Sequence, residues 1–175
     1  MPVVTCAERT STEPEGKDAG WVTNGTDNQL FYPYVSSCVT VTLVFDNGLL
    51  GGHASQVTTD SKNPQFKAAE NLLAVLERMA SAAPESSVRG AFKKIYFIGT
   101  TSASEWKLDQ AKDVIAKKFG QPSVTEPTKF NLSPVDVVFD TNEKKIYSVI
   151  RKDKTQGAAK TIEEAKEAVS EVEYV

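Results

Sequence analysis

Hydrophobic and polar residues alternate over residues 38–45, where valine, leucine or phenylalanine fills every odd position. This period of two, with many β-branched residues, predicts a β-strand. The next three residues (46–48, Asp-Asn-Gly) are typical of a tight hairpin turn. Residues 49–57 are the expected return strand. The pattern therefore predicts a β-hairpin.

Two longer segments show a helical period instead. At the start of residues 63–83, Asn63 suits an N-cap and Pro64 the first helical position. Apolar residues then recur on one face of this segment. Residues 104–119 carry a second apolar face, and Gly120 predicts the end of that helix.

The remaining periodic segments are shorter. Residues 93–100 predict a buried strand, and residues 135–139 and 146–150 predict a second hairpin. Residues 161–164 (Thr-Ile-Glu-Glu) form a capping box that predicts a short third helix.

Length and composition indicate one ordinary globular domain. The chain has 175 residues, of which 40% are hydrophobic and 25% charged. Residues 1–20 are rich in Glu, Thr, Pro and Gly, so we expect a disordered or loosely attached tail. Residues 21–175 are then expected to form a single domain.

Charge and cysteine content exclude several classes of protein. The net charge of −3 and the pI of about 5.3 argue against nucleic-acid binding, which needs a basic surface. The sequence has no apolar run long enough to cross a membrane and no recognisable signal peptide. Two cysteines indicate a reducing compartment, so we expect a cytoplasmic protein. One histidine and two cysteines without ligand spacing argue against a structural zinc site.

Candidate chemistry lies in the first hairpin, which holds Cys38 and the single histidine, His53. A nearby imidazole can convert a thiol into a nucleophilic thiolate. Gly51 and Gly52, just before the histidine, would let a substrate approach the ring without collision with a Cβ atom. The structural alternative is equally simple, since a free cysteine is often a small buried hydrophobe. The sequence does not say which third group orients the ring.

Strand geometry sets a condition on this pair. A turn at residues 46–48 places His53 opposite residues 40–42 and not opposite Cys38, a gap of about 7–13 Å in a flat ladder. Contact therefore requires strand twist, or a chain that curls away at residues 36–38.

The motif SSCVTVTLVFD followed by GGH resembles the Cys-then-His hairpin of CheD, the chemoreceptor glutamine deamidase, and of toxin deamidases of the cytotoxic necrotising factor type. The later order of helix, strand, helix and closing strand (VDVVFDTNEKKIYSVI) is similar to CheD over roughly residues 30–151. By this resemblance Cys38 matches the nucleophile and His53 the base, while Ser37 and the Cys38 N–H match the oxyanion contacts. The chain departs from the pattern at Tyr32, where CheD has a threonine that helps to orient the histidine. It also departs at Ser36, where CheD has a glycine.

The resemblance implies an α+β fold: a β-sandwich-like core of two packed sheets, with helices 63–83 and 104–119 covering its outside. It also implies a cysteine hydrolase that deamidates glutamine side chains of a protein and needs no metal or cofactor. The substrate would be a receptor-like protein in a bacterium, or a host protein if the chain is a delivered effector or toxin. The alternatives are a non-catalytic CheD-like protein-binding module and a related cysteine transferase or peptidase.

Overall fold

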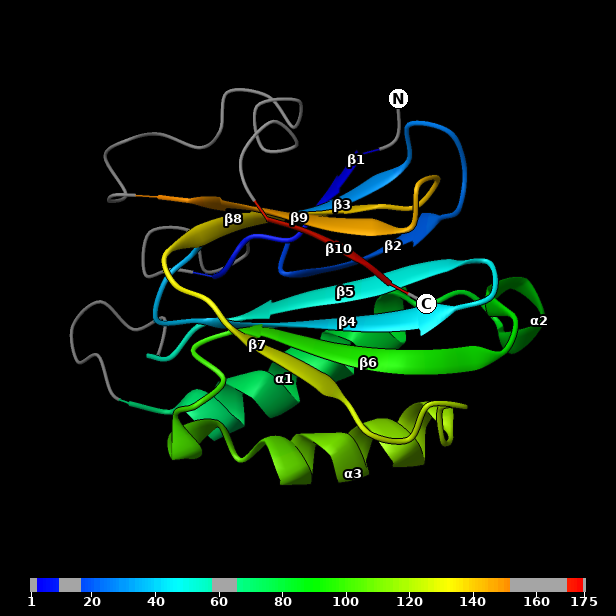
Figure 1. Cartoon of the computed structure of the whole chain (residues 1–175). Helices are drawn as coiled ribbons and strands as arrows, with labels where there is room; N and C mark the ends of the chain where they lie inside the picture. The colour runs from blue at the N-terminus through cyan, green and yellow to red at the C-terminus, as the bar shows by residue number, and fades with distance from the viewer. Residues whose placement is uncertain (1–2, 10–16, 58–65, 152–169, 175) are drawn as a thin grey trace.

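The computed structural model describes residues 3–9, 17–57, 66–151 and 170–174 (Figure 1). These residues form two packed five-stranded sheets, each of which mixes parallel and antiparallel pairs. The first sheet consists, in spatial order, of β1 (Val3–Thr5), β3 (Gln29–Val35), β8 (Val135–Asp140), β9 (Lys145–Ile150) and β10 (Ser170–Glu173). The second consists of β2 (Ala19–Thr23), β5 (Gly48–Ala54), β4 (Val39–Phe45), β6 (Phe92–Gly99) and β7 (Thr128–Asn131).

Both longer helices cover the same outer face of the second sheet, so the molecule has three layers (Figure 1). They are α1 (Ala68–Ala82) and α3 (Leu108–Phe119); a 3-10 turn (Ser104–Trp106) precedes α3, and the one-turn helix α2 is Ser86–Arg89. The predicted α+β class with two packed sheets is therefore confirmed. Asn63 and the expected helix at residues 161–164 lie outside the described residues. The first expected helix nevertheless begins later than predicted, at Ala68, because Phe66 pairs with Val57 in an isolated β-bridge and Lys67 is the N-cap.

Alternate residues of β4 face two different hydrophobic cores. Its odd residues, Val39 to Phe45, pack with residues of α1 and α3, whereas Cys38 and Val44 pack between the two sheets. All seven residues of β4 are buried, because helices cover one face of the strand and the first sheet covers the other. The threonines of β4 thus lie in the space between the sheets, where Thr40 donates a hydrogen bond to the carbonyl of Ile98.

The prediction of a loosely attached tail is wrong for the described residues 3–9 and 17–20. Strand β1 pairs in parallel with β3, β2 pairs with β5, and Cys6 is fully buried. The composition predicted a loose tail because the segment has few apolar residues. Those few, however, are part of the core between the sheets.

Candidate active site

The fold brings Cys38 and His53 together between the sheets. In the β4–β5 ladder His53 lies opposite Thr40, within the predicted range, and Cys38 lies two residues before Thr40 on the same face. The chain turns just before Cys38, where Ser37 has a left-handed φ of 48°. The Cys38 sulfur, a ring nitrogen of His53 and a carboxylate oxygen of Glu8 all lie within 4.8 Å of one another. We call these three residues the Cys–His–Glu cluster.

Glu8 is a member of this cluster that the sequence did not indicate. Its Oε2 lies 2.8 Å from the Cys38 sulfur, and the backbone carbonyl oxygen of Ser36 lies at the same distance. The thiol carries one hydrogen, so it can donate to only one of these acceptors at a time. Glu8 was assigned to the tail, and an isolated glutamate in a polar segment gives no signal of such a contact.

The backbone carbonyl of Cys6 orients the ring of His53. It lies 2.9 Å from Nδ1, and because a carbonyl only accepts hydrogen bonds, the proton of the neutral ring must be on Nδ1. Nε2 then carries the lone pair, and it has no hydrogen-bond partner among the described residues. In this tautomer Nε2 can accept a proton or bind a metal ion.

Burial keeps the imidazole neutral. His53 is fully buried, and desolvation lowers its pKa below the ordinary value. The Cys6 carbonyl and the negative charges of Glu8 and Asp18 act in the opposite direction but are weaker. The second thiol, Cys6, differs from Cys38 in having no part in the cluster, and burial raises its pKa to about 12.

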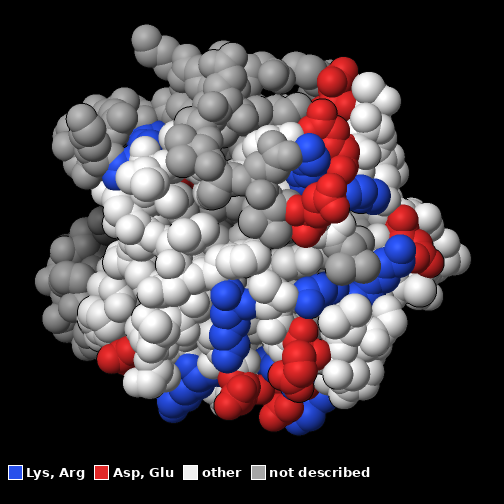
Figure 2. Space-filling model, viewed as in Figure 1, with Lys and Arg blue, Asp and Glu red and all other residues white. Residues whose placement is uncertain are grey.

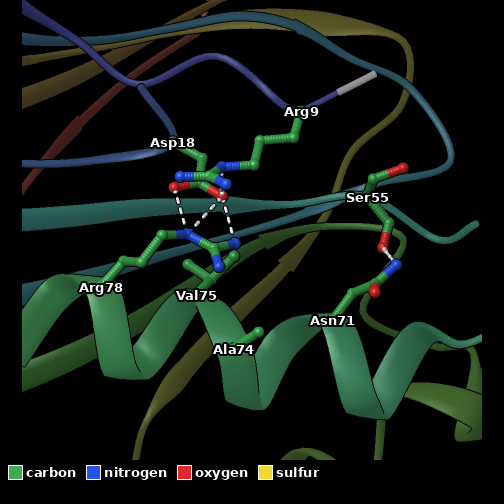
Figure 3. Close-up of a pocket in the computed structure, with 7 residues that line it drawn as sticks. All are labelled: Arg9, Asp18, Ser55, Asn71, Ala74, Val75 and Arg78. Carbon is green, nitrogen blue, oxygen red and sulfur yellow. Dashed lines mark hydrogen bonds and ion pairs between the residues drawn. The ribbon is translucent and has the colours of Figure 1, made fainter. Parts of the chain in front are cut away.

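An ion-pair network holds the segment that carries Cys6 and Glu8. Two nitrogens of Arg78 on α1 donate to the Asp18 carboxylate: Nε, which lies 2.8 Å from Oδ1 and 3.0 Å from Oδ2, and Nη2, which lies 2.5 Å from Oδ2 (Figure 3). The carboxylate also contacts Arg9 at 3.4 Å. These residues line a pocket of about 140 Å³ beside α1. The backbone carbonyl of Asp18 also accepts a hydrogen bond from the His53 N–H, so the network reaches the site directly.

The glycine pair does not give room to a substrate, so that prediction is wrong. A Cβ atom on Gly51 would lie 2.5 Å from the Tyr32 hydroxyl, and one on Gly52 would lie 2.5 Å from Val75 and Met79 of α1. Side chains of the protein itself fill both spaces. The glycines allow β5 to pack closely against the first sheet on one face and against α1 on the other.

Tyr32, at the departure from the CheD pattern, packs against His53 without a hydrogen bond to the ring. The two rings meet edge to face, with centroids 6.1 Å apart. The Tyr32 hydroxyl instead donates to the Val41 carbonyl and contacts Thr42 Oγ1 at 2.7 Å. The group that contacts the His53 ring nitrogen is the Cys6 carbonyl.

The cluster is closed to solvent in this structure. Only 1% of the Cys38 surface is exposed and none of that of His53. A substrate could therefore reach the sulfur only if the cluster opened, and the half-buried Glu8 side chain is one group that would have to move.

The outer surface gives little indication of a partner. Acidic and basic side chains are interspersed on the face drawn in Figure 2, which shows no continuous basic stripe. Among the described helices, none is long and apolar enough to cross a membrane.

No known family model matches the chain, and comparison with curated proteins gives no significant match.

Proposed function

We propose that this chain is a cysteine-dependent amidohydrolase that deamidates a glutamine side chain of a protein, with Cys38 as nucleophile and His53 as base. The observation that carries the proposal is the arrangement around His53. The Cys6 carbonyl fixes Nδ1, and the Cys38 sulfur lies within 4.8 Å of a ring nitrogen. Nucleophile, base and orienting group are the three parts that such catalysis needs.

The chemistry would proceed in two halves. His53 Nε2 takes the thiol proton, and the Cys38 sulfur attacks the amide carbon to form a tetrahedral intermediate. The imidazolium then protonates the leaving nitrogen, so that ammonia departs and a thioester remains. His53 next removes a proton from water, which attacks the thioester and releases the carboxylate and the thiol. The net reaction converts a carboxamide and water into a carboxylate and ammonium.

The turn before Cys38 supports an oxyanion site. Ser36 and Ser37 lie outside the strands, and the left-handed φ of Ser37 redirects the chain at this point. The N–H groups of Ser37 and Cys38 are the donors proposed for the negative oxygen of the intermediate.

The side chain that contacts the sulfur supports glutamine as the substrate. Glu8 places its carboxylate 2.8 Å from Cys38. Glutamate differs from glutamine only in an oxygen that replaces the amide nitrogen. A glutamine side chain that displaced Glu8 could therefore place its carboxamide against the sulfur.

Thiol reactivity tests the proposal, with Cys6 of the same molecule as the internal control. We expect iodoacetamide to modify Cys38 of the folded protein at neutral pH and to leave Cys6 unmodified, as peptide mass spectrometry would show. His53→Ala should slow modification of Cys38 at least about tenfold. The parent should also release ammonia from unfolded casein, a glutamine-rich probe. If iodoacetamide modified neither Cys38 nor Cys6 until the protein unfolded, the proposal would be wrong.

A non-catalytic protein-binding module is the second candidate, and the burial of the cluster favours it. In that case Cys38 and His53 would be core residues. Both cysteines would then resist alkylation equally, and His53→Ala would change stability alone.

A further inference from the structure

We propose that the Cys–His–Glu cluster binds a zinc ion through Glu8 Oε2, Cys38 Sγ and His53 Nε2. Zinc binding does not depend on the proposed hydrolase activity, because it uses the thiol as a ligand and not as a nucleophile. The residues come from three places in the chain that the fold alone brings together. For this reason the sequence, which lacks ligand spacing, argued against a zinc site.

His53 has the arrangement of a metal-binding histidine. Such residues usually donate one ring N–H to a carbonyl or carboxylate, which fixes the tautomer and directs the other nitrogen to the metal. Here Nδ1 has that contact, with the Cys6 carbonyl at 2.9 Å. Nε2 is fully buried without a hydrogen-bond partner in the described part of the chain. An unpartnered buried nitrogen is costly, and a bound metal removes that cost.

The ligand types suit zinc in chemistry and in charge. Thiolate sulfur, imidazole nitrogen and carboxylate oxygen are the three donor types that zinc prefers. One thiolate and one carboxylate balance the two positive charges of the ion, so the occupied site is neutral, as a buried site requires. Sodium, magnesium and calcium would find too few oxygen ligands here.

The separations need only small adjustments. Ligands of a tetrahedral zinc ion lie about 3.5 Å from one another, as bond lengths of roughly 2.0–2.3 Å require. A ring nitrogen of His53, the Cys38 sulfur and a Glu8 oxygen lie within 4.8 Å of one another, so any separation above about 3.5 Å must shorten. The 2.8 Å between Glu8 Oε2 and the sulfur must instead lengthen. Rotation of the Glu8 and Cys38 side chains can supply these adjustments.

Zinc would also block the proposed reaction. A thiolate bound to the ion cannot attack an amide carbon, and the ion would hold Glu8 over the sulfur. Metal binding and substrate binding would therefore exclude each other at this site.

The test is a titration of the metal-free full chain with Zn²⁺ in competition with a chromophoric chelator. We expect one zinc per chain. Cys38→Ser and His53→Gln should weaken binding at least about a hundredfold, and Glu8→Gln at least about tenfold. Glu70→Gln, which changes an exposed glutamate on α1, should have no effect. Co²⁺ should give visible bands of a tetrahedral ion and a thiolate charge-transfer band that Cys38→Ser removes.

Two results would overturn the proposal. One is a Cys38→Ser variant that binds Zn²⁺ as tightly as the parent. The other is a parent–Co²⁺ spectrum without the thiolate band, which decides the matter even if His53→Gln does not fold. Ammonia release is measured separately in metal-free protein. The hydrolase proposal and the zinc proposal can therefore fail independently of each other.

Discussion

Nδ1 of His53 lies 2.9 Å from the backbone carbonyl oxygen of Cys6, 47 positions earlier in the sequence. The N-terminal segment is therefore part of the site as well as part of the first sheet. It supplies the group that orients the ring and, two residues later, the carboxylate in contact with Cys38.

Deletion of residues 1–9 should therefore destabilise the protein and disturb the site. The deletion exposes the edge of β3 and empties the place of Cys6, so we expect a loss of roughly 3 kcal/mol or more in the free energy of unfolding. Urea denaturation would measure it. Thr5→Ala is the control, because the Thr5 side chain is exposed. A truncated chain with full stability would show that the segment is dispensable.

The single histidine makes its ionisation easy to follow. NMR titration of the His53 ring should give a pKa below the ordinary value of 6.5, because burial disfavours the imidazolium. The unfolded chain then binds more protons than the folded chain between the two pKa values. Stability should consequently fall as the pH decreases below about 6.5, by at most about 1.4 kcal/mol per pH unit. A midpoint at or above 6.5 in the folded protein would contradict this expectation.

Cys38→Ser should abolish ammonia release and change stability by less than about 1 kcal/mol. The serine hydroxyl can donate to the same two acceptors as the thiol, the Glu8 carboxylate and the Ser36 carbonyl. Calorimetry and the ammonia assay on the same preparation would check both parts. Full activity in the serine variant would exclude Cys38 as the nucleophile.

Gly52→Ala should destabilise the protein by about 1–3 kcal/mol. The added methyl group would lie 2.5 Å from a Val75 methyl carbon and from the Met79 sulfur, and the branched valine cannot easily move. The double variant Gly52→Ala, Val75→Ala should be less destabilised than the sum of the two single variants. Additive losses in urea denaturation would show that the two residues do not interact.

The buried ion pair of Asp136 and Arg151 offers a test of the first sheet. The nitrogen and oxygen lie 2.6 Å apart, and neither residue is more than 4% exposed. Arg151→Met leaves a buried carboxylate without its cation and should cost about 3–5 kcal/mol. Adding Asp136→Asn should recover part of this loss. A further loss of the same size in the double variant would mean that the pair is not coupled.

Local patterns predicted the elements whose partners are close in sequence. The hairpin of β4 and β5 followed from alternation and the Asp-Asn-Gly turn, which also gave the register of His53. The same holds for β8 and β9 and for the apolar faces of α1 and α3. The short edge strands β1 and β7 were missed because three or four residues carry too little period to be recognised.

The site was predictable only in the part that lies on the hairpin. Cys38 and His53 stood out because the chain has few cysteines and one histidine. Glu8 reaches them through long-range contacts, including the pairing of β1 with β3 and the ion pairs of Asp18. No pattern within the N-terminal segment records those contacts.

Because the orienting group at Cys6 is a main-chain carbonyl, no side-chain replacement can delete it. An alanine scan would report at position 6 only the packing of the thiol, and natural sequences could vary there without loss of the contact. The group can be weakened chemically by replacing the amide bond between residues 6 and 7 with an ester, whose carbonyl is a poorer acceptor. The same replacement removes the Ala7 N–H, which donates a hydrogen bond to the Lys17 carbonyl. A second ester, which removes another N–H donor of the segment, is therefore needed as a control.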